Sequence, residues 1–279
     1  MFPEVLPEIS DSDLEHFFQI MLSQYGMDFR GYATSSLKRR LGTVIKRYGL
    51  TGMAVLNQRL VTNPDYIDYF INEITVSTTE LFRDPSAWIA LRSQGLPLVQ
   101  HRPQLRIWHV GASTGEEVLS MAILLKETGL YEKAEIFATD IDRRSLEQAR
   151  RAVYPLRVYK GYEQNFIQVF PHLSLEKYAH VEVNQVFFDP SLLDRVRFLQ
   201  HNIVTEGTFG EFEVILCRNL LIYFTPALQN QVVTRLVDSL TEGGLLMIGT
   251  KESLFWCESA RRLSPVNEVE RIYRKRSSP

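Results

Sequence analysis

The sequence predicts an α/β protein in two parts: an all-helical N-terminal domain over residues 1–90 and an α/β domain over residues 91–279. Up to about residue 90, apolar residues recur at steps of three and four, which is the helical period. After Pro97 and Pro103, short apolar runs alternate with helical patterns. This alternation indicates a mainly parallel sheet with helices on both faces and right-handed crossovers.

Four helices are predicted in the N-terminal part. The first spans residues 10–25, where Ser12 and Glu15 form a capping box and Gly26 ends the helix. The others follow at similar spacing with polar breaks between them, at residues 34–48, 52–61 and 64–74.

Five strands are predicted in the second part, at residues 105–110, 134–139, 196–200, 212–217 and 245–249. Helical patterns lie between most of them, at residues 116–128, 145–152 and 226–240. Residues 158–193 break this alternation, because they are rich in Tyr, Phe and Asn and show no clear long helix. We expect this segment to form a small inserted subdomain.

The composition excludes several classes of protein. A formal net charge of -2 is an ordinary balance that by itself indicates neither nucleic-acid nor membrane binding, so any charged patch must be local, and 45% hydrophobic residues supply a core that needs neither disulfides nor a structural metal. The two cysteines, Cys217 and Cys257, are expected to be buried free thiols. No basic start precedes an apolar segment and no apolar run reaches about 18 residues, so we expect a cytoplasmic protein with no membrane insertion.

The turn after the first predicted strand is a candidate ligand site, because ligands of such sheets bind beyond the carboxyl ends of the strands. It reads Gly-Ala-Ser-Thr-Gly at residues 111–115, and the small side chains let the backbone approach a ligand closely. The following helix opens with Glu116 and Glu117, which would repel a phosphate. The two carboxylates suit a cationic ligand, such as the sulfonium and ammonium groups of S-adenosylmethionine. Capping of the helix by these residues is the alternative.

Two further acids end the second strand. Asp140 stands where a carboxylate accepts hydrogen bonds from a ribose diol. For Asp142 we favour a different role, as the N-cap of the next helix.

Together these motifs resemble the CheR family, the chemotaxis-receptor glutamate O-methyltransferases. The resemblance depends on Ser-Thr-Thr-Glu-Leu-Phe-Arg-Asp-Pro at residues 77–85, on the strand and turn at 106–117, on Ala-Thr-Asp-Ile-Asp at 138–142 and on Cys-Arg-Asn-Leu-Leu-Ile-Tyr-Phe at 217–224. A weaker fifth block is Gly-Thr-Lys-Glu-Ser-Leu at residues 249–254. The order and spacing of the blocks span nearly the whole chain.

The resemblance implies a Rossmann-like class I methyltransferase sheet with a small inserted β-subdomain, preceded by the helical domain. It implies methyl transfer from S-adenosylmethionine to glutamate side chains of a chemoreceptor, with Arg83 and Tyr223 at the reaction site. The cofactor-binding residues that it implies are Ser77, Thr79, Arg83, Gly111, Glu117, Asp140, Asn202, Ile203, Arg218 and Asn219. It implies no metal.

Such chemistry needs no general base, because a glutamate side chain with a pKa of about 4.3 is already ionised at neutral pH. The protein has to align the carboxylate, the methyl carbon and the sulfur. Arg83 suits this task, because its planar guanidinium can orient a carboxylate.

A basic face on the helix at residues 34–48 is a candidate docking surface for an acidic receptor segment. Its cations are Lys38, Arg39, Arg40, Lys46 and Arg47, and a solvated polar face is the alternative. Two other functions also compete with receptor methylation. One is a non-catalytic signalling module that binds S-adenosylmethionine, and the other is a methyltransferase that acts on a different protein.

Overall fold

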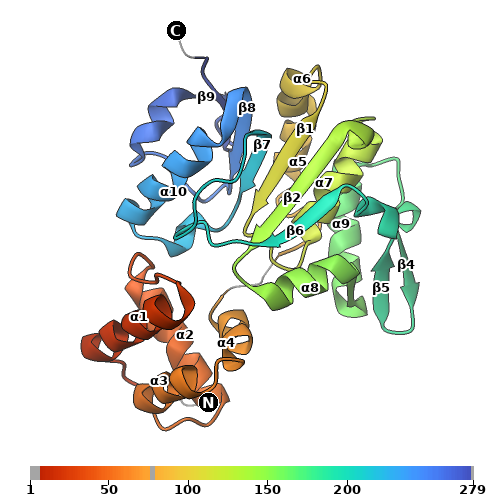
Figure 1. Ribbon diagram of the computed structural model, residues 1–279. Coiled ribbons are helices and arrows are strands. Elements are labelled where there is room, and N and C mark those ends of the chain that lie inside the picture. Colours follow the sequence, from red (N-terminus) through yellow and green to blue (C-terminus); the bar gives the residue numbers. More distant parts are fainter. Residues whose placement is uncertain (1–6, 76–78, 278–279) are drawn as a thin grey trace.

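The N-terminal part is a group of four helices with a core of its own, as the sequence predicts. The computed structural model describes residues 7–75 and 79–277, and in it these helices lie together beside the sheet domain (Figure 1). Phe17, Met21 and Phe70 are among the side chains that fill the helical core. The helices are α1 (Asp11–Tyr25), α2 (Thr34–Arg47), α3 (Met53–Thr62) and α4 (Tyr66–Ile74).

The first helix begins one residue later than expected and has a different cap. Ser10 is the N-cap, because its backbone is still extended, and its Oγ accepts a hydrogen bond from the backbone N–H of Asp13 at 3.1 Å. The Asp13 carboxylate accepts the N–H of Ser10 in return, so the predicted capping box of Ser12 and Glu15 is wrong. Gly26 ends the helix in the left-handed conformation, with φ of 66°, as predicted.

The second part contains a seven-stranded, mainly parallel sheet, which confirms the predicted fold class. The strand order is β6-β2-β1-β7-β8-β10-β9. Strand β10 runs antiparallel to both of its neighbours, β8 and β9. The strand bounds are β1 (Leu105–Val110), β2 (Ala134–Asp140), β6 (Val196–Gln200), β7 (Phe212–Cys217), β8 (Leu240–Ile248), β9 (Leu263–Asn267) and β10 (Ile272–Lys275).

Helices cover both faces of this sheet. One face packs against α5 (Pro85–Ala90), the π-helical turn η1 (Leu91–Gly95), α6 (Leu96–Val99) and α7 (Glu116–Glu127), and the other packs against α10 (Pro226–Asp238). The helix α8 (Arg143–Arg151) contacts β2 and β6. Short 3₁₀ turns complete the domain: η2 (Tyr131–Lys133), η3 (Leu156–Val158), η4 (Leu175–Lys177), η5 (Pro190–Leu192), η6 (Leu221–Tyr223) and η7 (Glu258–Arg262). Cys217 and Cys257 are buried free thiols, as expected.

A second, three-stranded antiparallel sheet stands apart from the main one. It has the order β3-β5-β4, formed by β3 (Val153–Pro155), β4 (Ala179–Glu182) and β5 (Gln185–Phe188), and the β4–β5 hairpin projects from the domain (Figure 1). The expectation of no long helix in this segment is wrong, since α9 (Tyr159–Val169) lies here. Tyr162, Phe166 and Val169 form its buried stripe, which the intervening polar residues concealed. The predicted bounds 1–90, 91–279 and 158–193 stay predictions, and β3 lies just before the last of these ranges.

A short backbone contact joins the helical domain to the sheet domain. Tyr32 and Phe224 form an isolated antiparallel bridge. Two backbone hydrogen bonds of 2.8 Å make it: the N–H of Ala33 donates to the carbonyl oxygen of Tyr223, and the N–H of Thr225 donates to the carbonyl oxygen of Gly31. Gly31 permits this close approach, because a Cβ atom there would lie 2.7 Å from Leu228 Cδ2. The helical domain is thereby fixed beside the carboxyl ends of β1, β2 and β7.

Among the residues that the structure describes, none of the helices combines the length and the apolar character needed to span a bilayer.

Candidate functional site

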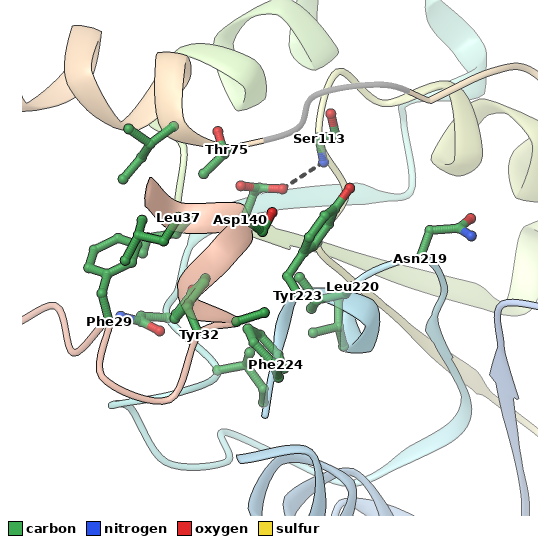
Figure 2. A pocket seen from close by; sticks show the side chains of 18 of the residues that line it. Phe29, Tyr32, Leu37, Thr75, Ser113, Asp140, Asn219, Leu220, Tyr223 and Phe224 are labelled. Carbon is green, nitrogen blue, oxygen red and sulfur yellow. Dashed lines mark hydrogen bonds between the residues drawn. The ribbon is translucent and has the colours of Figure 1, made fainter. Parts of the chain in front are cut away.

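A pocket lies between the two domains, where the central parallel strands end (Figure 2). It encloses about 930 Å³ of space free of protein atoms, the open mouth included. We call it the interdomain pocket. The sheet domain lines it with Val110, Gly111, Ser113, Thr139, Asp140, Ile141, His201, Asn202, Ile203, Arg218, Asn219, Leu220, Tyr223 and Phe224. The helical domain adds Phe29, Tyr32, Ala33, Ser36, Leu37, Arg40, Ile74 and Thr75.

The glycine turn after β1 forms the floor of this pocket. Gly111 has a φ of +75°, a conformation that other residues rarely adopt, and a Cβ atom there would lie 3.4 Å from Leu220. Gly115, at a φ of +94°, leaves no room for a Cβ atom, which would lie 2.7 Å from Ala149 Cβ. Among the described residues the buried Oγ of Ser113 has no hydrogen-bond partner, whereas its backbone N–H donates to Asp140 at the pocket.

Asp140 lies in the pocket, at the end of β2. One carboxylate oxygen accepts the backbone N–H of Ser113 and the other accepts that of Asp142, each at 2.8 Å. Burial raises the pKa of Asp140 to about 6. Asp142 has the other role that was predicted, because its side chain accepts the N–H of Arg144 at 3.0 Å and caps α8.

We expect ligand binding to depend on the ionisation of Asp140. Since the pKa is about 6, the carboxylate is ionised at pH 7.5 and mostly protonated at pH 5. A hydrogen bond to a charged acceptor is stronger by roughly 1 kcal/mol, so affinity for S-adenosylhomocysteine should fall about fivefold over that range. Isothermal titration calorimetry measures this. Asp140→Asn should bind more weakly without the change near pH 6; if the variant keeps that change, another group causes it.

Beside the interdomain pocket lies a smaller and more polar pocket, lined by Thr79, Arg83, Gly111, Ser113, Glu117, Arg218, Asn219 and Tyr223. We call it the polar pocket. Five of these residues also line the interdomain pocket: Gly111, Ser113, Arg218, Asn219 and Tyr223. The two pockets therefore form one continuous site, in which the structure brings together most of the predicted residues.

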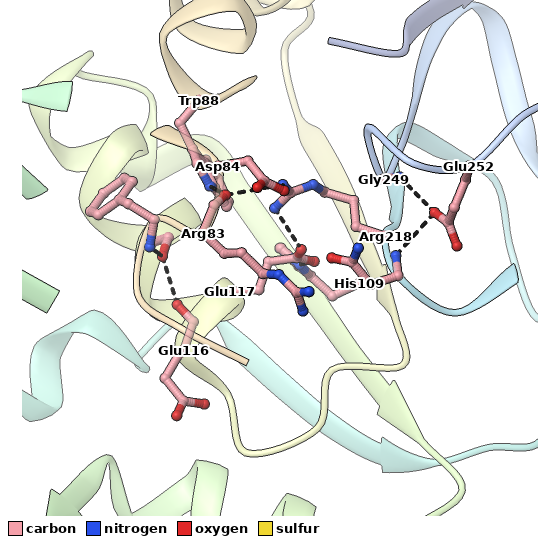
Figure 3. Close-up of polar contacts among 12 residues, drawn as sticks. Arg83, Asp84, Trp88, His109, Glu116, Glu117, Arg218, Gly249 and Glu252 are labelled. Atoms are coloured by element: carbon pink, nitrogen blue, oxygen red, sulfur yellow. Dashed lines mark hydrogen bonds and ion pairs between the residues drawn. The ribbon is translucent and has the colours of Figure 1, made fainter. Parts of the chain in front are cut away.

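Arg218 holds the polar pocket together (Figure 3). Its side chain is only 1% exposed and donates to Asp84 Oδ2 at 2.9 Å, to Glu117 Oε2 at 3.2 Å and to the carbonyl oxygen of Arg83 at 3.0 Å. Trp88 Nε1 donates to the same carbonyl oxygen at 3.1 Å. One guanidinium thus fastens the segment that carries Thr79 and Arg83 to the start of α7.

The two glutamates that open α7 have different environments. Glu117 lines the polar pocket, and its Oε1 lies 2.9 Å from Nδ1 of His109. Burial alone would raise the pKa of Glu117, but the bond from His109 and the charge of Arg218 hold it below its usual value. Glu116 is buried elsewhere, where it accepts hydrogen bonds from Tyr162 and Thr114 at 2.7 Å each, and burial raises its pKa.

The prediction that both acids face a cationic ligand is therefore wrong for Glu116. Consecutive residues on a helix point about 100° apart, so a carboxylate pair in sequence seldom shares one face. Glu116 instead connects the glycine turn to Tyr162 of α9.

The buried carboxylate of Glu252 is a functional group that no sequence pattern predicted. It accepts the backbone N–H groups of Gly249 at 2.6 Å, Asn219 at 3.0 Å and Ile222 at 3.3 Å. Burial raises the pKa of Glu252, and the three N–H donors oppose that shift. This carboxylate fixes the loop after β7, in which Asn219 has a φ of +59°. In the sequence, Glu252 stands out only as part of the weak block at residues 249–254, and nothing in that block indicates why a carboxylate is needed there.

Tyr223 faces both pockets, and the helical domain reaches it through Arg40. The guanidinium carbon of Arg40 lies 4.5 Å from the centre of the Tyr223 ring, and its NH1 donates to the carbonyl oxygen of Ile74 at 2.6 Å. Arg40 therefore points into the site, and its assignment to an exposed docking face is wrong. The remaining cations lie outside, where Lys38 pairs with Asp11 at 2.8 Å and Arg47 pairs with Glu73.

The last predicted residues are Asn202, Ile203 and Ser77. Asn202 and Ile203 line the interdomain pocket, and the side-chain oxygen of Asn202 accepts the N–H of Val204 at 2.9 Å. Ser77 lies outside the described residues.

These residues fit S-adenosylmethionine. The Glu117 carboxylate suits the ammonium group, Asp140 suits the ribose diol, and the bare backbone of Gly111 beside them lets a ligand approach closely. Apolar side chains such as Ile141 and Ile203 can pack on a purine ring. In the described part of the chain, no group of three or more His, Cys, Asp or Glu side chains is placed to hold a metal ion.

Comparisons with known proteins agree with this site. The CheR methyltransferase all-alpha domain matches residues 12–75, and the CheR methyltransferase SAM binding domain matches residues 77–269. The chain is 33% identical over 266 residues to the protein Cher3 of Pseudomonas putida, a methyltransferase by name, with 95% of this chain and 97% of that protein covered.

Relatives with a chemotaxis name are similar over most of their length. The chemotaxis protein methyltransferase of Listeria monocytogenes is 28% identical over 254 residues, covering 90% of this chain and 93% of that protein. Among solved structures, the N-methyltransferase NodS of Bradyrhizobium japonicum aligns with a TM-score of 0.41 and 11% identity, covering 71% of this chain and 89% of NodS. The two family models together span most of the sequence, and the chain therefore belongs to the CheR family of S-adenosylmethionine-dependent chemotaxis protein methyltransferases.

Proposed function

We propose that the protein transfers the methyl group of S-adenosylmethionine to glutamate side-chain carboxylates of a chemoreceptor-like signalling protein. The products are glutamyl methyl esters and S-adenosylhomocysteine. One observation carries the choice of acceptor: the described residues that line the polar pocket include no His, Lys or Cys to act as a general base, and the one carboxylate among them, Glu117, is already bonded to His109 and Arg218. An acceptor that arrives already ionised, such as a carboxylate, needs none.

The polar side chains of the pocket support an orienting role. Arg83 and Tyr223 both line it, and a planar guanidinium can hold a carboxylate through two parallel hydrogen bonds. Tight binding of the carboxylate would stabilise the ground state as well as the transition state, so we assign Arg83 to orientation. Arg40 holds the Tyr223 ring in place from the other domain.

The bound cofactor supplies an electrophilic methyl group. Transfer of this group to a carboxylate oxygen would break the carbon–sulfur bond and leave its electron pair on sulfur, so the residues of the chain would only have to hold the two reactants in line. No proton moves in this step, which fits a site whose buried acid, Glu117, is occupied by His109 and Arg218.

We further propose that the partner is the cytoplasmic part of a chemoreceptor, since two relatives carry the name chemotaxis protein methyltransferase. The outward cations of α2 remain candidates for contact with an acidic receptor segment: Lys38, Arg39, Lys46 and Arg47. A salt dependence of receptor methylation would agree with this docking surface.

The test uses S-adenosylmethionine labelled in its methyl group, incubated with the protein and a receptor cytoplasmic fragment. We expect label in the receptor that mild alkali releases as methanol, because a carboxyl ester is base-labile. A fragment with its accepting glutamates replaced by alanine serves as the matched control. Alkali-stable label would contradict glutamate methylation. In a parallel incubation with a cell lysate, label on other proteins alone would indicate a different substrate. Cofactor binding with no transfer at all would support a non-catalytic module.

A further inference from the structure

His109 is a buried polar residue in an otherwise apolar layer. It lies on the central strand β1, where Leu105 and Ile107 alternate with it and pack in the core that faces α7. His109 itself is 0% exposed. Burial of an imidazole at this depth costs free energy unless its hydrogen bonds are made, so its presence requires an explanation.

The ring has one polar contact among the described residues. Its Nδ1 lies 2.9 Å from Glu117 Oε1, whereas Nε2 is buried without a hydrogen-bond partner. Because Glu117 is held ionised and a carboxylate only accepts, the proton of this bond belongs to Nδ1 of His109. The ring therefore directs its donor at Glu117.

The Glu117 carboxylate is consequently held from two sides. His109 donates to Oε1 and Arg218 donates to Oε2 at 3.2 Å, which leaves the remaining lone pairs of a 16% exposed side chain toward the polar pocket. An unrestrained glutamate side chain has several rotamers, and restricting it to one rotamer when the ligand binds lowers the affinity. A carboxylate that is already fixed avoids this cost.

We propose that His109 is a positioning residue for cofactor binding, which acts by fixing the Glu117 carboxylate toward the ammonium group of S-adenosylmethionine. This inference rests on the proposed cofactor role of Glu117 and is independent of which carboxylate accepts the methyl group.

The contacts of the His109 ring distinguish a positioning role in cofactor binding from a purely structural role in the core. A side chain that only fills the core would be replaced by leucine without loss, since leucine removes the unpartnered Nε2 and suits the apolar layer. We therefore expect His109→Leu to lower stability modestly, because the buried Glu117 carboxylate loses one donor, and to weaken ligand binding, which a side chain that only fills the core would leave unchanged.

The experiment measures the affinity for S-adenosylhomocysteine by calorimetry. His109→Leu and His109→Phe both remove the hydrogen-bond donor but differ in side-chain shape. If one variant fails to fold, the other can still be measured. Each should weaken binding about tenfold, which corresponds to the ordering of one rotamer-rich side chain. His109→Asn, whose Nδ2 occupies the place of Nδ1, should bind within about threefold of the wild type.

A double-mutant cycle with Glu117→Ala decides the mechanism. If His109 acts through Glu117, His109→Leu should cause no further loss of affinity in the Glu117→Ala background. An equal loss in both backgrounds, a His109→Asn variant as weak as His109→Leu, or unchanged affinity in His109→Leu and His109→Phe would each overturn the inference. If Glu117→Ala alone binds normally, the cofactor role of Glu117 is wrong and the inference fails with it. None of these readouts involves a methyl acceptor, so they stay distinct from a failure to methylate glutamate.

Discussion

Replacement of Arg218 by alanine is expected to abolish detectable binding of S-adenosylhomocysteine and to lower the free energy of unfolding by about 3 kcal/mol. The side chain is 1% exposed and connects Asp84 to Glu117, so its removal leaves a buried carboxylate without its countercharge. The loss should lie at the lower end of the range for a broken buried pair, because water screens the 36% exposed side chain of Asp84. Urea denaturation and calorimetry measure the two effects.

Arg218→Lys is the matched control for this change. A lysine keeps the positive charge but lacks the planar fork that reaches Asp84, Glu117 and the Arg83 carbonyl oxygen together. It should recover part of the stability and little of the binding. An Arg218→Ala protein as stable as the wild type would contradict the structural role that we assign to this network.

Replacement of Arg83 by alanine is expected to lower the rate constant for receptor methylation by about 10²–10³-fold, since a misplaced acceptor alone costs on the order of 10²-fold. The segment should stay anchored, because the variant retains the backbone carbonyl oxygen of Arg83, which accepts hydrogen bonds from Trp88 and Arg218. Single-turnover methylation of a receptor fragment measures the rate constant, and thermal unfolding measures stability.

The affinity of the Arg83→Ala variant for S-adenosylhomocysteine separates its two assigned roles. A loss of rate with normal affinity would assign the side chain to the acceptor, whereas weaker binding would support the cofactor contact that the resemblance implies. Arg83→Lys should recover only a small part of the rate, because an ammonium cannot hold a carboxylate with two parallel bonds. Near-normal turnover of Arg83→Ala at saturating receptor would contradict orientation by this residue.

Much of the fold could be predicted because its signals are local. The strands β1, β6 and β7 coincide with their apolar runs, and Gly26 ends α1 because glycine adopts a left-handed conformation easily. The capping role of Asp142 is local in the same way, since it involves a backbone N–H two residues away.

The rest of the site depends on contacts between distant segments, which no local pattern specifies. Glu116 and Glu117 are adjacent in sequence, yet one bonds Tyr162 of the insert and the other bonds Arg218. Arg40 carries the same charge as its neighbours on α2, and only the position of Tyr223 in the other domain shows that it points inward. The approach of Glu252 to the loop after β7 is likewise a tertiary contact.

The bridge between Tyr32 and Phe224 bears on how this protein can be recombined with its relatives. It joins the helical domain to the very loop that carries Tyr223, with Gly31 packed against Leu228. The two domains are therefore poor candidates for free exchange in chimaeras. A helical domain transplanted from a relative would need a glycine at the position of Gly31 to pack on Leu228 and a basic side chain at the position of Arg40 to contact Tyr223. Without them, the interdomain pocket of the chimaera would lose the side that the helical domain provides.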